Sequence, residues 1–120
     1  MTKEVSLDLL KLIVKAIDDK NGHDMIVFDQ RGHSILSDYN IIVSGRSDRQ
    51  VLAIAKAVSD IAHDEGLNVS VEGKSAAHWI LVDLGDIIVH IFDPEARENY
   101  QLEKLWMDSS QVDVSDWLAS

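Results

Sequence analysis

A short turn of small polar residues is the first candidate for chemistry in this chain of 120 residues. Ser44-Gly45-Arg46-Ser47 lies between a segment with strand character and a segment with helical periodicity. Backbone N–H groups at the start of a helix can bind an anion such as phosphate. The turn is not a P-loop, because the G-x-x-x-x-G-K-[ST] spacing and its lysine are missing. A Ser47 cap at the start of the helix explains the same residues equally well.

A glycine-serine turn before a helix is also similar to the corresponding turn of nucleotidyltransferases. Those enzymes need closely spaced carboxylates on a neighbouring strand to hold Mg²⁺ near the substrate phosphates. The nearest candidates are Asp83 and Asp86, which would act together with Gly45 and Ser47. These aspartates flank a predicted hairpin turn, rather than standing two apart on one face of a strand. We therefore expect no enzyme, and keep a small nucleotidyltransferase-like enzyme as the alternative function.

The five histidines do not indicate a metal site. None has a partner at position i+2 or i+4 that would complete a metal signature. His90 falls on an interior strand, where a hydrogen-bonded core histidine is more common than a ligand. No nucleophile elbow is present that would support a Ser-His-Asp triad. We therefore expect neither a metal nor a cofactor.

The charge of the chain limits its partners. There are 11 Lys and Arg residues against 21 Asp and Glu residues, which gives a net charge of −10. Binding to nucleic acids rests on Lys and Arg contacts to phosphates, so we expect no direct nucleic-acid binding. A basic protein surface is a better partner, because complementary charge speeds encounter and orients docking. The same charge could also serve solubility alone.

Length and composition predict one ordinary cytosolic domain. A chain of 120 residues is long enough to bury a core without disulfides. The absence of cysteine excludes a disulfide framework and a cysteine-ligated zinc site. The N-terminus lacks the apolar stretch of a signal peptide, and no apolar run reaches the ~18 residues of a membrane span. We expect a cytoplasmic protein that does not contact a membrane.

Hydrophobic periodicity predicts three helices and a sheet of about five strands. The expected helices are 6–19, 47–65 and 94–107. The expected strands are 25–28, then 35–36 or more strongly 39–44, followed by 68–71, 78–84 and 87–92.

Gly85-Asp86, between the last two strands, predicts a two-residue hairpin turn. That turn fixes the register, which pairs Trp79 with Phe92 on one face and Ile80 with Ile91 on the other. Trp79 is then either a core residue packed on Phe92 or part of a surface contact. Both faces are largely apolar, so both must be covered. We predict a single α/β domain with a mixed sheet flanked by helices on both faces.

The third predicted helix carries an aromatic residue outside its buried stripe. At about 100° per residue, Leu102, Leu105 and Trp106 fall in one sector that is wide enough to be buried. Tyr100 falls on the opposite side among charged residues, where it is either idle or a contact residue. Residues 1–107 then form the domain, and the mostly polar, acidic residues 108–120 form a loosely held C-terminal tail.

Two segments are similar to one known family. The first is S-D-Y-N-I-I-V-S-G-R-S-D-R-Q-V at 37–51, followed by A-I-A at 53–55. The second is E-G at 72–73, W-I-L-V-D-L-G-D-I-I-V-H-I-F at 79–92, Arg97, and Y-x-L-E-K-L-W at 100–106. Together they resemble the ribosomal silencing factor family, also called Iojap or DUF143. The resemblance runs from the first helix to Trp106.

The resemblance implies a fold related to nucleotidyltransferases, without their catalytic residues. It also implies binding to the large ribosomal subunit through large-subunit ribosomal protein fourteen, on the face where the small subunit docks. A factor bound there blocks subunit joining sterically and lowers translation when nutrients are scarce. The family also forms homodimers.

Carried over by position, the partner-binding residues are Trp79, Ile80, Tyr100, Glu103 and Trp106. Ile80 conflicts with the predicted register, which places it on the aliphatic face. The chain departs from the family at residue 40, where it has an asparagine and the family often has an apolar residue. This difference could weaken local packing or a dimer contact.

Overall fold

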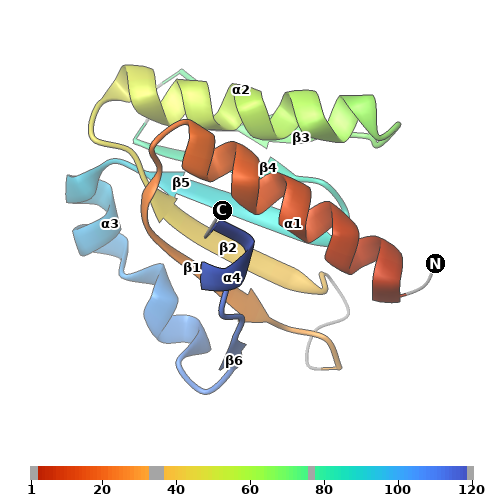
Figure 1. The fold of residues 1–120 in the computed structure, drawn as a ribbon. Helices are drawn as coiled ribbons and strands as arrows, with labels where there is room; N and C mark the ends of the chain where they lie inside the picture. The colour runs from red at the N-terminus through yellow and green to blue at the C-terminus, as the bar shows by residue number, and fades with distance from the viewer. Residues whose placement is uncertain (1–2, 33–36, 76–77, 119–120) are drawn as a thin grey trace.

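A mixed sheet with strand order β3-β4-β5-β2-β1-β6 organises the chain in this computed structural model, which describes residues 3–32, 37–75 and 78–118 (Figure 1). The strands are β1 (His23–Asp29), β2 (Tyr39–Ser44), β3 (Ser70–Glu72), β4 (Trp79–Asp83), β5 (Ile87–Phe92) and β6 (Ser110–Gln111). The helices are α1 (Lys3–Asp19), α2 (Asp48–Asp64), α3 (Pro94–Tyr100), the 3₁₀-helix η1 (Leu102–Trp106) and α4 (Ser115–Leu118). Strands β2 and β5 are parallel, and the other neighbouring strands are antiparallel.

The two faces of the sheet are covered unequally. Helices α1 and α2 lie side by side over one face and enclose the larger hydrophobic core, which includes Ile13, Val58 and Ile80 (Figure 1). The short α3 and η1 lie on the other face, over a smaller core built around Phe28, Ile42 and Phe92. The prediction of a mixed α/β sheet with helices on both faces is confirmed, with β6 as a strand that was not expected.

The predicted register of the β4-β5 hairpin is confirmed. Trp79 pairs with Phe92 and Ile80 with Ile91, and the Leu84 N–H donates to the Ile87 carbonyl at 2.9 Å beside the turn. Because side chains alternate along a strand, Trp79 and Ile80 lie on opposite faces of the sheet. The possible strand at residues 35–36 lies outside the described residues.

The Ser47 cap at the start of α2 is confirmed. The Ser47 Oγ accepts a hydrogen bond from the Gln50 backbone N–H at 3.2 Å. The Gln50 side chain reaches back to the Arg46 N–H, one residue before the position that a capping box uses. The first helix begins at Lys3, earlier than the predicted residue 6. None of the described helices is both long and apolar enough to cross a membrane.

The third predicted helix is in fact two helices. Helix α3 ends at Tyr100, Gln101 adopts the left-handed conformation at φ 46°, and η1 follows. This break changes the direction of the side chains that follow it. The buried stripe predicted for one continuous helix is therefore wrong. Leu105, predicted to be buried, is 72% exposed, whereas Leu102 and Trp106 are half-buried.

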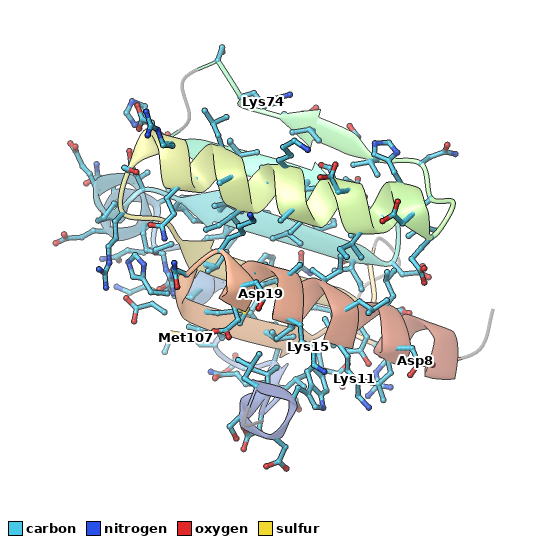
Figure 2. All side chains as sticks on the ribbon, turned by 45° about the horizontal axis from the view of Figure 1, so that its top comes forward. Asp8, Lys11, Lys15, Asp19, Lys74 and Met107 are labelled. Atoms are coloured by element: carbon cyan, nitrogen blue, oxygen red, sulfur yellow. The ribbon has the colours of Figure 1, made fainter. Side chains whose placement is uncertain are left out.

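The C-terminal segment differs from the expected loosely held tail. Strand β6 pairs with the edge of β1, and the Val112 N–H donates to the Val27 carbonyl at 2.8 Å. Val112, Val114, Trp117 and Leu118 are partly buried against the larger core. Lys11, on the side of α1 that also carries Lys15 (Figure 2), places its ammonium 5.6 Å from the centre of the Trp117 ring. These four apolar residues and the pairing of β6 thus hold the segment against the domain.

Candidate partner-binding surface

A row of ring side chains crosses the face of the sheet that α3 and η1 cover. Trp79 stacks on Phe92 with ring centroids 5.1 Å apart and an interplanar angle of 24°. Tyr100 packs against the same tryptophan at 4.9 Å. At the other end of the row, Trp106 lies 5.7 Å from the His90 ring. These contacts join β4, β5, α3 and η1 into one aromatic cluster, which we call the aromatic row.

Trp79 is fixed from two sides. Its indole Nε1–H donates to Nδ1 of His90 at 3.3 Å. Behind it, the Gly73 backbone has φ 91°, and a β-carbon there would lie 2.2 Å from the Trp79 carbonyl oxygen. Only glycine therefore permits this approach of the chain to the start of β4. The hydrogen bond to His90 and the stacking on Phe92 orient the indole, and the Tyr100 ring packs against it.

His90 is a structural acceptor in this cluster. Burial lowers its pKa from 6.5 to about 4, because desolvation disfavours the charged imidazolium. The ring is therefore neutral near pH 7, and acceptance at Nδ1 leaves the proton on Nε2. A hydrogen-bonded core histidine was the predicted interpretation, and it is confirmed.

The depressed pKa gives a direct test by NMR. The His90 ring signals should stay constant from pH 8 to pH 5 and titrate near pH 4. The folded-state pKa is lowered, so the unfolded state binds the proton first and acid favours unfolding between pH 6.5 and 4. Titration of His90 near pH 6.5 in the folded protein would contradict this burial.

Tyr100 is the part of the row that faces solvent. It is the last residue of α3 and is 59% exposed, although one side of its ring rests on Trp79. Leu105 and Met107 follow in the chain and are each 72% exposed. Exposed apolar side chains that cluster are typical of interaction sites, whereas isolated ones are ordinary.

Arg97 organises the polar side of this surface. Its Nη1 donates to the Ser44 Oγ at 2.9 Å, and its Nε donates to the Glu103 Oε2 at 3.1 Å. The guanidinium is nearly buried, so these bonds tie the end of β2 to α3 and η1. Sequence reasoning named Glu103 as a contact residue but gave Arg97 no role, because its partner Ser44 is 53 residues away.

Ile80 does not belong to this surface. Its side chain is 0% exposed and lies in the core under α1 and α2. Of the five predicted contact residues, Trp79, Tyr100, Glu103 and Trp106 lie on the α3 and η1 side, and Ile80 faces the opposite way. The conflict between the register and the family resemblance is resolved in favour of the register.

The side chain of Asn40 has a hydrogen-bond partner within the domain. It is buried, and its Nδ2 donates to the Ser37 Oγ at 3.1 Å. A buried polar side chain with a partner costs little, so the departure from the family pattern does not leave a packing defect.

The residues of the alternative enzyme do not come together. Gly45 and Ser47 follow the end of β2, which pairs with Phe92, whereas Asp83 and Asp86 flank the hairpin before Ile87. The six-residue strand β5 separates these ends by about 17 Å. One Mg²⁺ cannot bridge that distance, because its ligands lie at ~2.1 Å.

A different set of possible metal ligands lies beside the turn. Among the described residues, Asp48, His78 and Asp93 have ligand atoms within 4.8 Å of one another. The Asp93 oxygens are already engaged, since one accepts from the Ala96 N–H at 2.8 Å and the other contacts His78 Nδ1 at 2.5 Å. The hydrogen bond and charge of Asp93 raise the pKa of His78. This arrangement is that of a capped helix start with an ion pair.

Comparisons with known proteins agree with this architecture. The family model described as ribosomal silencing factor during starvation matches residues 3–120. A ribosomal silencing factor of Bacillus subtilis is 44% identical over 107 residues, which cover 88% of this chain and 91% of that protein. A mouse protein named mitochondrial assembly of ribosomal large subunit protein 1 is 33% identical over 81% of this chain and 44% of its own length. A crystal structure from Bacillus halodurans matches with TM-score 0.79 and 38% identity, covering 89% of this chain and 98% of that one.

Proposed function

Because the chain belongs to the ribosomal silencing factor family, we propose that it binds the large ribosomal subunit through large-subunit ribosomal protein fourteen. The bound protein sterically blocks joining of the small subunit and so lowers translation when nutrients are scarce. It acts by binding and not by catalysis, in the cytoplasm where ribosomes work.

The observation that carries this proposal is the position of Tyr100 on Trp79. A tyrosine that is 59% exposed and already held by a stacked tryptophan loses little conformational entropy when it is covered. Rigid aromatic residues of this kind are the usual anchors of protein interfaces. Trp106 lies on the same side of the sheet and extends the row toward β1.

Charge supports a protein partner over a nucleic-acid partner. The net charge of −10 repels phosphate groups and attracts a basic surface of the kind that ribosomal proteins present. The name of the mouse relative refers to assembly of the ribosomal large subunit, which agrees with a contact on that subunit. A stable contact needs ~1,200–2,000 Å² of buried surface in total, which one face of a domain this size can supply.

Subunit joining is the direct test. Purified large subunits are incubated with increasing amounts of the protein, small subunits are added, and the products are separated by sucrose gradient sedimentation. We expect the protein to co-sediment with large subunits and to reduce the joined ribosome peak in proportion to its occupancy. Undiminished joining with the large subunit fully occupied would refute the steric mechanism.

The family resemblance also implies a homodimer, which we propose for the free protein. Leu105 and Met107 are large apolar side chains exposed beside the aromatic row, and a second copy would cover them. Light scattering should then report a mass near twice 13.4 kDa at micromolar concentration. A Leu105→Asp substitution should return the mass to that of one chain.

A further inference from the structure

A polar pocket of about 280 Å³ lies beneath the joint between α3 and η1. Residues of four elements line it, because the start of β1 and the end of β2 meet α3 and η1 there. The residues used below are His23, Asp24, Arg97, Gln101, Glu103 and Lys104. The pocket adjoins the proposed partner surface, since Glu103 and Lys104 are part of η1, which follows Tyr100 closely.

Two buried atoms of this pocket lack partners within the described part of the chain. They are Nδ1 of His23 and Oε1 of Glu103. The other carboxylate oxygen of Glu103 accepts from Arg97, so the side chain is already held in place with one acceptor left over. Leaving a buried acceptor without a hydrogen bond is unfavourable, because its lost hydration is not replaced. Two such atoms in one pocket therefore favour an occupant that donates hydrogen bonds.

The backbone around the pocket is strained. Asp24 has φ 52° and Gln101 has φ 46°, values that side chains other than glycine adopt only at a cost. Such conformations cluster at functional sites, although one that ends a helix, as Gln101 does, is also common. Gln101 sits at the break between α3 and η1, so its conformation turns Glu103 back toward Arg97.

The charges of the pocket select the kind of donor. A carboxylate oxygen and an imidazole nitrogen without a proton both accept hydrogen bonds. Arg97 donates to Glu103 Oε2 and Ser44 Oγ, and none of its N–H groups donates to Glu103 Oε1. An alkylammonium or guanidinium group supplies several donors and a positive charge.

We propose that this pocket receives a lysine or arginine side chain of the protein to which the aromatic row binds. The inference rests on the proposed function, which supplies a basic partner at the neighbouring surface. Tyr100 and Trp79 then provide apolar contact area, while Glu103 and His23 fix the register of the partner by recognising one cation. Charge-assisted hydrogen bonds are well suited to such positioning.

The test compares Glu103→Gln with the matched control Glu65→Gln, which removes the same charge from an exposed position at the end of α2. The glutamine can still accept from Arg97 but presents an amide donor to the pocket. Co-sedimentation with purified large subunits should weaken about tenfold for Glu103→Gln and less than twofold for the control. If Glu103→Gln does not fold, His23→Phe keeps a ring but removes the acceptor, and it carries the same prediction.

The direction in which a second substitution changes the affinity distinguishes a cationic occupant from an anionic one. Lys104→Gln should leave binding unchanged or strengthen it, because Lys104 competes with an incoming cation. If the wild type binds large subunits and Glu103→Gln binds as well as Glu65→Gln, the proposed cation pocket is wrong and the proposed function stands. Weaker binding by Lys104→Gln than by Glu103→Gln also overturns the cation pocket, since that order indicates an anionic occupant. A wild-type protein that ignores large subunits overturns the proposed function and the pocket together.

Discussion

Replacing Tyr100 by alanine should weaken binding to the large ribosomal subunit about 30-fold, which corresponds to about 2 kcal/mol. The ring is held against Trp79 at 4.9 Å and Phe92 at 6.2 Å, yet more than half of it faces solvent. Truncation removes an anchor that is already ordered before the partner arrives. Because the residue is exposed, the free energy of unfolding should change by less than about 1 kcal/mol. Co-sedimentation at constant salt measures the first effect, and urea unfolding measures the second.

Two further variants separate the ring from the hydroxyl group and from general hydrophobicity. Tyr100→Phe keeps the packing on Trp79 and should retain most of the affinity if apolar contact dominates. Leu12→Ala removes an exposed apolar side chain from α1, which covers the opposite face of the sheet, and should bind like wild type. A Tyr100→Ala protein that co-sediments as well as wild type would remove the aromatic row from the mechanism.

The parts of the fold that could be predicted are those with a strong local signal. The Gly85-Asp86 turn fixed one hairpin, and strict alternation then determined which residues share a face. Helix α2 was predicted nearly to its bounds, because the Ser47 cap marks its start and Gly66, with φ 76°, follows its end. The two-residue strand β6 has no periodicity, and its pairing depends on an edge of β1 that forms elsewhere in the sequence.

The break at Gln101 was missed for a similar reason. Left-handed residues that end a helix are usually glycine or asparagine, and neither stands at this position. Without that signal, one continuous helix was the simplest interpretation of residues 94–107. The consequence was large for the site, because the break exposes Leu105 and turns Glu103 toward Arg97.

The candidate site was predictable only in its aromatic part. Tyr100 stood out because it did not fit a buried stripe, and the family resemblance gave it a partner. The polar pocket could not be foreseen, since its walls come from residues 23, 44, 97 and 103, which no sequence spacing relates. Such clusters depend on how β1 and β2 meet α3, and that arrangement is a property of the tertiary structure.

Trp79 and Ile80 are adjacent in the sequence and were both expected at the partner surface, but they should respond to truncation in different ways. Ile80→Ala should lower the free energy of unfolding by about 2–5 kcal/mol, because a fully buried isoleucine leaves a cavity under α1 and α2. Leu52→Ala, on the exposed side of α2, should cost less than about 1 kcal/mol. Urea unfolding measures both variants.

Binding to the large subunit should nevertheless survive in Ile80→Ala at a temperature where the variant is still folded. Its side chain points into the larger core, and the proposed partner surface lies across the sheet on the side of Trp79. Stability and affinity therefore separate at neighbouring positions, because alternate residues of one strand serve opposite faces. An Ile80→Ala protein with unchanged stability and weakened binding would place this side chain at the partner surface and reverse the assignment of the two faces.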